Sequence, residues 1–140
     1  MTVVLDTNVV VSALHFAGRN AIPAFALERA VNIEVLATCD EIDAEISRIL
    51  IERFRWPQHR VESELRIMFR RSIRVTLYNT VHLCRDPDDD KILECAERAK
   101  ADLIITGDKD LLSLRVHRRT RIVTPAVYLR MNPDPPPPRR

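Results

Sequence analysis

The stretch "VVLDTNVVV" (residues 3–11) places one carboxylate, Asp6, between two apolar runs. The apolar residues before Asp6 predict a short buried strand, and those after Asn8 predict the start of a buried helix. An unpaired charge in a protein core is unfavourable by several kcal/mol. Asp6 is therefore expected either to cap the helix that follows or to lie where the strand end opens onto a functional site.

The composition is that of one ordinary globular domain with a sizeable core. The chain has 140 residues, of which 46% are hydrophobic. The 2 glycines and 5% aromatic residues argue against an all-β sandwich or barrel. The net charge of +2 implies no polycation, although 19 of the 22 basic residues are arginine. Arginine suits bidentate phosphate contacts, but such a bias equally fits the base composition of a genome.

The cysteines and the hydropathy favour a cytoplasmic protein. Cys39, Cys84 and Cys95 show no C-x-x-C spacing, which fits a reducing compartment and predicts neither a disulfide nor a zinc site. His82 lies two residues from Cys84, but no second ligand pair accompanies them. No apolar run approaches the roughly 18 residues of a membrane span, and no basic region precedes an apolar one as in a signal peptide.

Short apolar strands alternate with helical patterns along the chain. This alternation predicts an α/β fold with a parallel sheet covered on both faces. One domain is expected over residues 1–131, and the Pro-rich segment 132–140, "NPDPPPPRR", is expected to be a disordered tail. Strands are expected over 2–6, 33–38, 73–77, the start of 102–114 and 120–124, and helices over 7–18, 22–31, 39–54, 58–72, 86–101, the end of 102–114 and 125–131.

Helical periodicity separates acids that face water from acids that face inward. In the third predicted helix, Glu45 borders the apolar stripe. In the fifth, Asp89 lies within the stripe, whereas Asp88 and Asp90 are displaced by about 100° to either side. The alternative is that "DPDDD" (86–90) is a solvated cap at the positive end of a helix dipole. That alternative explains the inward-facing Asp89 least well.

Two further acids follow buried strands at once. Asp6 follows the first strand, and Asp108 follows the strand in "LIITGD", with Asp110 two residues later. In open parallel sheets, ligands gather at the carboxyl ends of the strands. A convergent set is therefore expected, against the alternative of independent caps and surface acids. Its members are Asp6, Glu45, Asp89 and Asp108, with Asp110 close by.

Such a cluster predicts a divalent cation. Carboxylates at short range raise each other's pKa, and a bound cation relieves this repulsion. Carboxylate oxygens and water are the ligands of Mg²⁺ and Mn²⁺, and no His or Cys lies in these motifs. Asp6 is thus expected to be a metal ligand, with Thr7 and Asn8 beside it as a helix cap and a possible substrate contact.

Four segments, "VLDTNVVVSAL", "EIDAEISRIL", "CRDPDDDKILECA" and "LIITGDKDLL", resemble in order and spacing the motifs of PIN-domain ribonucleases. The resemblance is greatest to the VapC-type toxins of toxin–antitoxin pairs and runs over about residues 2–130. It implies a three-layer α/β/α fold with a five-stranded parallel sheet, ordered 3-2-1-4-5. It also implies Mg²⁺- or Mn²⁺-dependent RNA cleavage, a small antitoxin partner and a homodimer. The Pro-rich tail is not a feature of that family.

The resemblance also implies roles for individual residues. The implied catalytic acids are Asp6 in D-T-N, Glu45 in A-E-I, Asp89, and Asp108 in T-G-D. The implied metal ligands are the same four residues and Asp110. Thr106 matches the hydroxyl residue that precedes the turn in the family. The implied supporting residues are Thr7, Asn8, Asp90 and Thr106.

RNA needs a basic approach to an acidic site, and two arginine-rich stretches could provide one. The alternative for both is a solvated surface interleaved with acids such as Glu52, Glu62 and Glu64. Trp56 and Phe54 could stack a base, although a core role is favoured. The first stretch holds Arg53, Arg55, Arg60, Arg66, Arg70, Arg71 and Arg74; the second holds Arg115, Arg118, Arg119 and Arg121, with His117.

Other classes fit the sequence less well. A phosphoacceptor receiver domain needs an acidic pair after the first strand, where only Asp6 stands, and has no counterpart of Glu45. A haloacid-type phosphatase needs D-x-D, and "DTN" lacks the second acid. A catalytically silent PIN-fold module that binds RNA or protein keeps the fold but leaves the acids unexplained.

Overall fold

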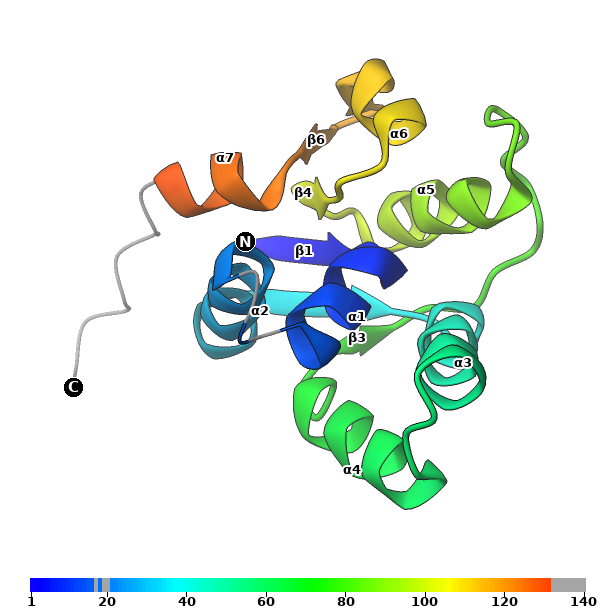
Figure 1. Ribbon diagram of the computed structural model, residues 1–140. Helices are drawn as coiled ribbons and strands as arrows, with labels where there is room; N and C mark the ends of the chain where they lie inside the picture. Colours follow the sequence, from blue (N-terminus) through cyan, green and yellow to red (C-terminus); the bar gives the residue numbers. More distant parts are fainter. Residues whose placement is uncertain (17, 19–20, 132–140) are drawn as a thin grey trace, which may run out of the picture.

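A computed structural model describes residues 1–16, 18 and 21–131, and it shows a sheet with helices against both faces (Figure 1). The strands are β1 (Thr2–Leu5), β2 (Val35–Thr38), β3 (Ile73–Arg74), β4 (Leu103–Ile105), β5 (Val116–His117) and β6 (Thr120–Val123). The helices are α1 (Thr7–His15), α2 (Ala21–Ile33), α3 (Asp40–Arg48), the π-helical turn η1 (Ile49–Arg53), α4 (Gln58–Met68), α5 (Pro87–Ala99), α6 (Lys109–Leu114) and α7 (Pro125–Arg130).

The strand order within the described residues is β3-β2-β1-β4-β6-β5. The first five strands of this order run parallel and give the α/β class and the topology expected from the sequence. The expected count of five strands was wrong by one, because β5 adds an antiparallel edge strand to β6. The sequence of β5 is only "VH", too short and too polar to form an apolar alternation.

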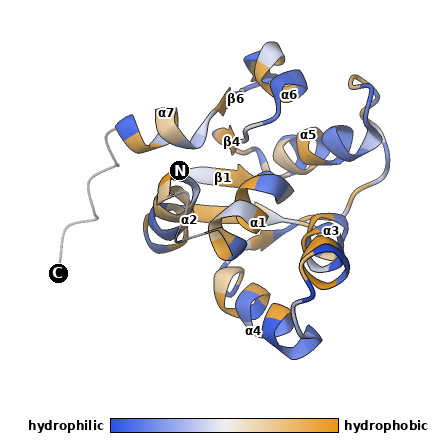
Figure 2. Ribbon diagram, viewed as in Figure 1, coloured by the Kyte–Doolittle hydropathy of each residue, from blue (hydrophilic) through white to orange (hydrophobic). Residues whose placement is uncertain are grey.

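The core lies around the two central strands. Val3, Val4, Ile104 and Ile105 have no exposed surface, because helices cover both faces of a parallel sheet. Figure 2 shows hydrophobic residues concentrated on the strands, whereas the outer helices α4 and α6 carry many hydrophilic ones. The pairing Leu5↔Ile105 brings the carboxyl ends of β1 and β4 to the same place. No helix in the described part of the chain is both long and apolar enough to cross a membrane.

Several predicted boundaries differ from the structure. The first helix ends at His15, and its N-cap residue is Asp6. The long third helix gives way at Ile49 to η1, where the Phe54 N–H donates to the Ile49 carbonyl. The predicted strand 73–77 keeps only two residues, both exposed, at the sheet edge. The expected tail 132–140 lies outside the described residues, so the domain division remains a prediction.

Helix α7 is held by a buried polar pair to Glu34, the residue between α2 and β2. The Tyr128 hydroxyl donates to Glu34 Oε2 at 2.8 Å, and Tyr128 has no exposed surface. Burial and the Glu34 carboxylate raise the pKa of Tyr128. The Arg29 guanidinium lies over the Tyr128 ring, 4.6 Å from its centroid, and donates to the carbonyls of Tyr128 and of Met131, which follows the helix.

We expect Tyr128→Phe to lower the free energy of unfolding by about 1–3 kcal/mol, because Glu34 loses a buried hydrogen-bond donor. Urea denaturation measures the change. Tyr78→Phe is the matched control, because Tyr78 is 66% exposed. The free energy of unfolding of this variant should stay close to that of the wild type. Equal stability of Tyr128→Phe and Tyr78→Phe would show that the Glu34 contact does not hold α7.

Candidate active site

The site lies at the carboxyl ends of β1 and β4, where the chain leaves each strand. The Asp6 N–H donates to the Ile105 carbonyl at 3.0 Å, so pairing between the strands continues to Asp6. The chain then turns into α1. After β4 it passes through Thr106, Gly107 and Asp108 into α6. Two strand-to-helix turns are therefore neighbours in space although about a hundred residues separate them.

Thr106 links the two turns. It has no exposed surface, and its hydroxyl donates to Asp6 Oδ2 at 2.6 Å. The Thr106 Oγ1 atom also accepts the Asp108 N–H at 2.9 Å. Asp108 is the N-cap residue of α6, and its Oδ1 accepts N–H groups from Asp110 and Leu111. These bonds hold the carboxylates of Asp6 and Asp108 in defined orientations.

A third element brings the next acid. Helix α5 begins after Asp86, whose side chain accepts the Asp88 N–H at 2.9 Å, and Pro87 occupies its first turn. Asp89 in this first turn is buried. Carboxylate oxygens of Asp89, Asp108 and Asp110 all lie within 4.8 Å of one another. We call these three residues the acidic cluster.

Asp6 lies close enough to the acidic cluster for its charge to affect the pKa of Asp89. Burial, followed by the charges of Asp108 and Asp6, raises the pKa of Asp89 to about 7. Burial also raises the pKa of Asp6, opposed by the Thr106 hydroxyl, while the Asp108 charge adds to the increase. These two buried acids therefore repel the remaining carboxylates, as expected for a site that takes a cation.

The donor set of the acidic cluster fits a hard divalent ion. It consists of carboxylate oxygens only, which is the chemistry of Mg²⁺ and Mn²⁺ rather than of zinc. A divalent ion would lower the raised pKa of Asp89 by supplying the missing positive charge. The residues present are therefore suited to hold such an ion.

Glu45 lies outside the acidic cluster. Its carboxylate pairs with the Arg48 guanidinium, with distances of 2.7 Å and 3.1 Å from Nη2 and Nε. Its side chain is half-buried, as helical periodicity predicts, and it lines a cavity of about 20 Å³ with Thr7 and Asp88. Sequence reasoning did not weigh Arg48, the cation one turn later on the same helix.

The three consecutive aspartates of α5 occupy different environments. Asp88 is exposed and pairs with Lys91 at 3.2 Å. Asp89 lies in the acidic cluster. Asp90 is buried away from the cluster and accepts the N–H groups of Leu83 and Cys84 at 2.9 Å and 2.8 Å. The burial of Asp90 was not expected, because the irregular segment just before the helix folds back over that side of it.

Asn8 lies beside Asp108 of the acidic cluster and does not line the cavity that holds Glu45. With Gly107 and Asp108 it lines a cavity of about 370 Å³, which Ser12, Pro23 and Pro125 complete. Asn8 is exposed. Its amide therefore shares a cavity with Asp108, and the substrate contact expected for Asn8 stays a prediction.

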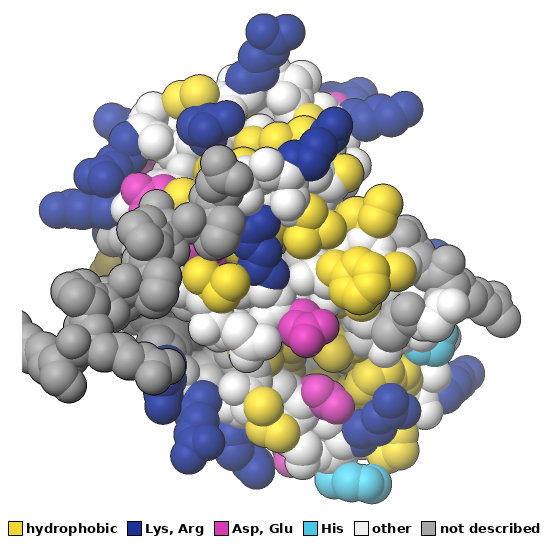
Figure 3. All heavy atoms as spheres, turned by 90° about the vertical axis from the view of Figure 1, so that its left-hand side faces the viewer, with side chains coloured by type: hydrophobic (Ala, Val, Ile, Leu, Met, Phe, Trp, Pro, Cys, Tyr) yellow, Lys and Arg dark blue, Asp and Glu magenta, His cyan; other side chains and the backbone are white. Residues whose placement is uncertain are grey.

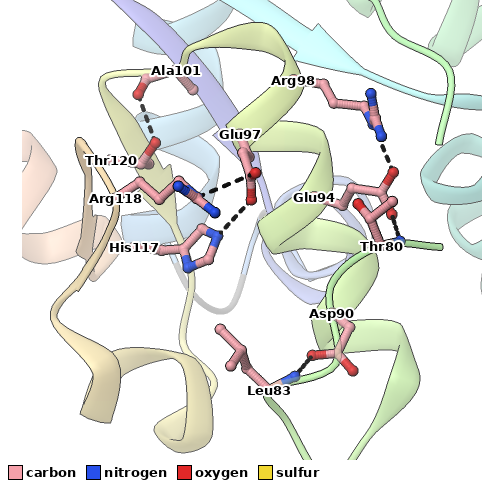
Figure 4. A network of polar contacts seen from close by, with 10 residues as sticks. All are labelled: Thr80, Leu83, Asp90, Glu94, Glu97, Arg98, Ala101, His117, Arg118 and Thr120. Atoms are coloured by element: carbon pink, nitrogen blue, oxygen red, sulfur yellow. Dashed lines mark hydrogen bonds and ion pairs between the residues drawn. The ribbon is translucent and has the colours of Figure 1, made fainter. Parts of the chain in front are cut away.

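The expected RNA-binding arginines of the second stretch lie away from the acidic cluster. Arg118 and Arg119 form the turn before β6, at the amino end of the parallel strands, and pair with Glu97 at 3.2 Å and Asp102 at 3.7 Å. Figure 4 shows Arg118 beside Glu97, at the end of α5 far from Asp90. Arg115, after α6, is exposed. The structure does not bring the turn arginines to the strand ends that carry the acids.

The aromatic residues near Pro57 have a packing role. Trp56 is buried, and its indole N–H donates to His15 Nδ1 at 3.1 Å. The Arg60 guanidinium covers the Trp56 ring at 3.6 Å from its centroid. The Phe54 ring stacks on His15 with a centroid distance of 4.0 Å. Trp56 is therefore not available to stack a base.

Arg85 is the site residue that sequence reasoning missed. Its Nη2 lies 3.1 Å from Asp110 Oδ1 and 3.2 Å from Asp110 Oδ2. Its position directly before the Asp86–Pro87 cap of the helix that carries Asp89 was the available signal. A cation at the start of that helix lies close to Asp89, the acid that the helix brings to the strand ends.

The fold and the carboxylates define a class of α/β protein with an acidic site at its strand ends, and known proteins refine this class. A family model described as "PIN domain" matches residues 2–110. The chain belongs to the PIN domain family. An uncharacterized protein of Methanocaldococcus jannaschii, MJ1680, is 35% identical over 118 residues, which cover 81% of this chain and 74% of that protein.

A solved structure shares the fold. In the crystal structure of VapBC2 from Rickettsia felis bound to a DNA fragment from their promoter, one chain superposes with a TM-score of 0.62 and 17% sequence identity. The match covers 89% of this chain and 98% of that chain. The similarity therefore extends over nearly the whole fold.

The raised pKa of Asp89 predicts a pH-dependent stability of the ion-free protein. The unfolded group has its ordinary pKa of 3.8, whereas the folded group titrates at about 7. Because the folded state holds this proton more tightly than the unfolded state, Asp89 contributes its full stabilisation below pH 3.8. This contribution to the free energy of unfolding is lost as the pH rises through about 7. In EDTA, the free energy of unfolding should therefore fall more steeply with pH in the wild type than in Asp89→Asn, as urea midpoints measure.

Asp88→Asn is the control for this measurement. It removes a charge from the neighbouring position, but Asp88 is exposed and lies outside the acidic cluster. It should keep the wild-type dependence on pH. A wild-type slope in Asp89→Asn as well would contradict the burial and repulsion inferred for Asp89.

Proposed function

We propose that the protein is a metal-dependent endoribonuclease, and probing its acidic cluster tests this. The observation that carries the proposal is the approach of Asp89, Asp108 and Asp110 within 4.8 Å, with Asp6 next to them. Membership of the PIN domain family supports nuclease activity. RNA as the substrate rests on the resemblance of the four motifs to PIN-domain ribonucleases.

Asp6, Asp89, Asp108 and Asp110 are the residues that would hold Mg²⁺ or Mn²⁺. When bound, such an ion polarises the phosphate and makes a water molecule more acidic. Glu45 would serve only if it left Arg48, so we assign it to the rim of the site. The proposed ligands thus come from the end of β1 (Asp6), the start of α5 (Asp89) and the start of α6 after β4 (Asp108 and Asp110).

The residues of the chain supply orientation and proton transfer. The Thr106 hydroxyl holds Asp6 Oδ2, and the α6 cap holds Asp108, so the carboxylates need little reorganisation on binding substrate. The oxygen of the attacking water forms a bond to phosphorus as a phosphorus–oxygen ester bond breaks. Whichever of these four carboxylates stays outside the ligand shell of the ion accepts the proton of that water, and the departing ester oxygen takes a proton from solvent. Asn8 contacts the substrate from the adjoining cavity.

We further propose that the protein is the toxin of a toxin–antitoxin pair. The support is the fold shared with a chain of the VapBC2 structure and an apolar surface suited to a small partner. A groove of about 240 Å³ between α1, α2 and α4 is lined by Leu14, Leu27 and Met68, with Glu28 and Glu64 beside them. Such a groove takes the apolar face of a helix, and its acids favour a basic one.

More apolar surface lies on the side of α2 and α7. Ile22, Phe25, Ile33 and Val127 are exposed there, and Figure 3 shows hydrophobic side chains gathered on this face among basic ones. Exposed apolar patches mark association surfaces. A homodimer remains a prediction from the resemblance, and this face is one candidate for its interface.

The cleavage experiment compares isosteric changes of the acids. Asp6→Asn, Asp89→Asn and Asp108→Asn should each reduce RNA cleavage roughly 100-fold or more, because changes even beyond the metal ligands lower activity 10- to 100-fold. Asp88→Asn, exposed and paired with Lys91, is the matched control and should retain activity. EDTA should abolish cleavage, and Mg²⁺ or Mn²⁺ should restore it. If Asp89→Asn kept full activity and Asp88→Asn lost it, Asp88 and not Asp89 would be the acid of the site.

Thermal melting separates the enzyme from a silent module of the same fold. At about a hundred times its Kd, an ion that binds only the folded state adds roughly 2.7 kcal/mol and raises Tm by several degrees. The rise should exceed that in NaCl of matched ionic strength and should shrink in Asp108→Asn but not in Asp88→Asn. Ion binding without RNA cleavage would favour the silent module, and no ion binding would contradict the metal site.

A further inference from the structure

The chain between β3 and α5 is held against α5 by buried carboxylates. We call residues 75–86 the strap. Glu94 of α5 is buried and accepts the N–H groups of Tyr78 and Thr80 at 2.7 Å and 3.0 Å. The Arg98 guanidinium donates to the same carboxylate at 2.7 Å. Figure 4 shows Thr80 and Arg98 on either side of the Glu94 carboxylate. Charge-assisted bonds to a buried carboxylate make this a firm attachment.

A second attachment holds the strap next to Arg85. Asp90 accepts the N–H groups of Leu83 and Cys84 through one oxygen, and Figure 4 shows the Leu83 bond. On the other side of Arg85, the side chain of Asp86 caps α5. The backbone is thus fixed immediately before and after Arg85. Its side chain therefore starts from a defined point beside the acidic cluster.

The Arg85 side chain is placed for binding rather than for stability. It is 89% exposed, and its partner Asp110 is 45% exposed. An ion pair this exposed contributes little to folding, so stability does not account for it. At the acidic cluster, Arg85 brings a positive charge to carboxylates that repel one another. It also faces solvent, where the backbone of a nucleic acid would approach.

We propose that Arg85 is a substrate-positioning residue: it neutralises Asp110 in the ion-free site and binds an RNA phosphate once Asp110 holds the ion. The inference rests on the proposed nuclease function and adds a cation that the acidic ligands lack. A guanidinium is suited to this exchange because its planar fork binds carboxylate and phosphate alike. The turn arginines Arg118 and Arg119, already paired with Glu97 and Asp102, lie too far from the site to do so.

Arg85→Gln should change the affinities for ion and for RNA in opposite directions. Without RNA, the Kd for Mn²⁺ should fall roughly two- to fivefold, because a cation no longer competes for Asp110. The electron paramagnetic resonance signal of free Mn²⁺ measures this Kd. The Kd for a random-sequence single-stranded RNA pool, measured with Ca²⁺ and checked for intact RNA, should rise roughly tenfold.

The salt dependence identifies a direct phosphate contact. The slope of log Kd against log salt should become shallower by about 0.7 in Arg85→Gln, the contribution of one contact to a single strand. Arg85→Lys should restore the slope, since a lysine also binds a phosphate, but only part of the affinity. Lys91→Gln is the matched control: Lys91 is an exposed cation near the start of the same helix, paired with Asp88 instead of with the cluster. It should leave both affinities unchanged.

The outcomes distinguish this inference from the proposed function. If the wild type binds and cleaves RNA but Arg85→Gln matches it in Mn²⁺ affinity and salt slope, the role of Arg85 is wrong and the nuclease stands. If Arg85→Gln weakens Mn²⁺ binding, Arg85 supports the site structurally and the inference fails. If the wild type neither binds nor cleaves RNA, both fail together.

Discussion

The hydrogen bond from Thr106 to Asp6 is the contact on which the arrangement of the site depends. Asp6 is buried at the end of a central strand, and a carboxylate there needs compensation. The compensation comes from the neighbouring strand, because the pairing Leu5↔Ile105 places the Thr106 hydroxyl next to Asp6. The same hydroxyl accepts the Asp108 N–H and so sets the following turn. The sheet register therefore determines where both acids lie.

The fold holds the carboxylates of the site close together although they repel one another. Four carboxylates gather where burial and mutual repulsion raise the pKa of Asp89 to about 7. The apolar core and the caps of α5 and α6 hold them there despite the repulsion. Such preorganisation lowers stability in the ion-free state and increases the free energy gained when a cation arrives. Arg85 offsets part of the repulsion through Asp110.

The sequence predicted those features that depend on residues close together in the chain. The continuous apolar runs gave the buried strands, and helical periodicity singled out Asp89 from its neighbours. Contacts made by a single side chain or by a very short segment were not predictable in this way. The Glu45 carboxylate pairs with Arg48, the strap covers Asp90, and β5 forms only by pairing with β6. In each case the decisive partner had no periodic signal, since a single side chain or a two-residue strand carries none.

Helix α5 joins these parts through two differently used faces. Its apolar side packs on the sheet and carries Asp89 to the strand ends. Asp90, Glu94 and Glu97 recur at intervals of four and three residues, which places them on a second common face. The first two hold the strap, and Glu97 binds His117 at 3.0 Å and Arg118 at 3.2 Å in the β5–β6 turn. Figure 4 shows this acidic face along the helix. A shift of α5 would thus move Asp89, the strap that carries Arg85 and the sheet edge together, so the geometry of the site is coupled to contacts remote from it.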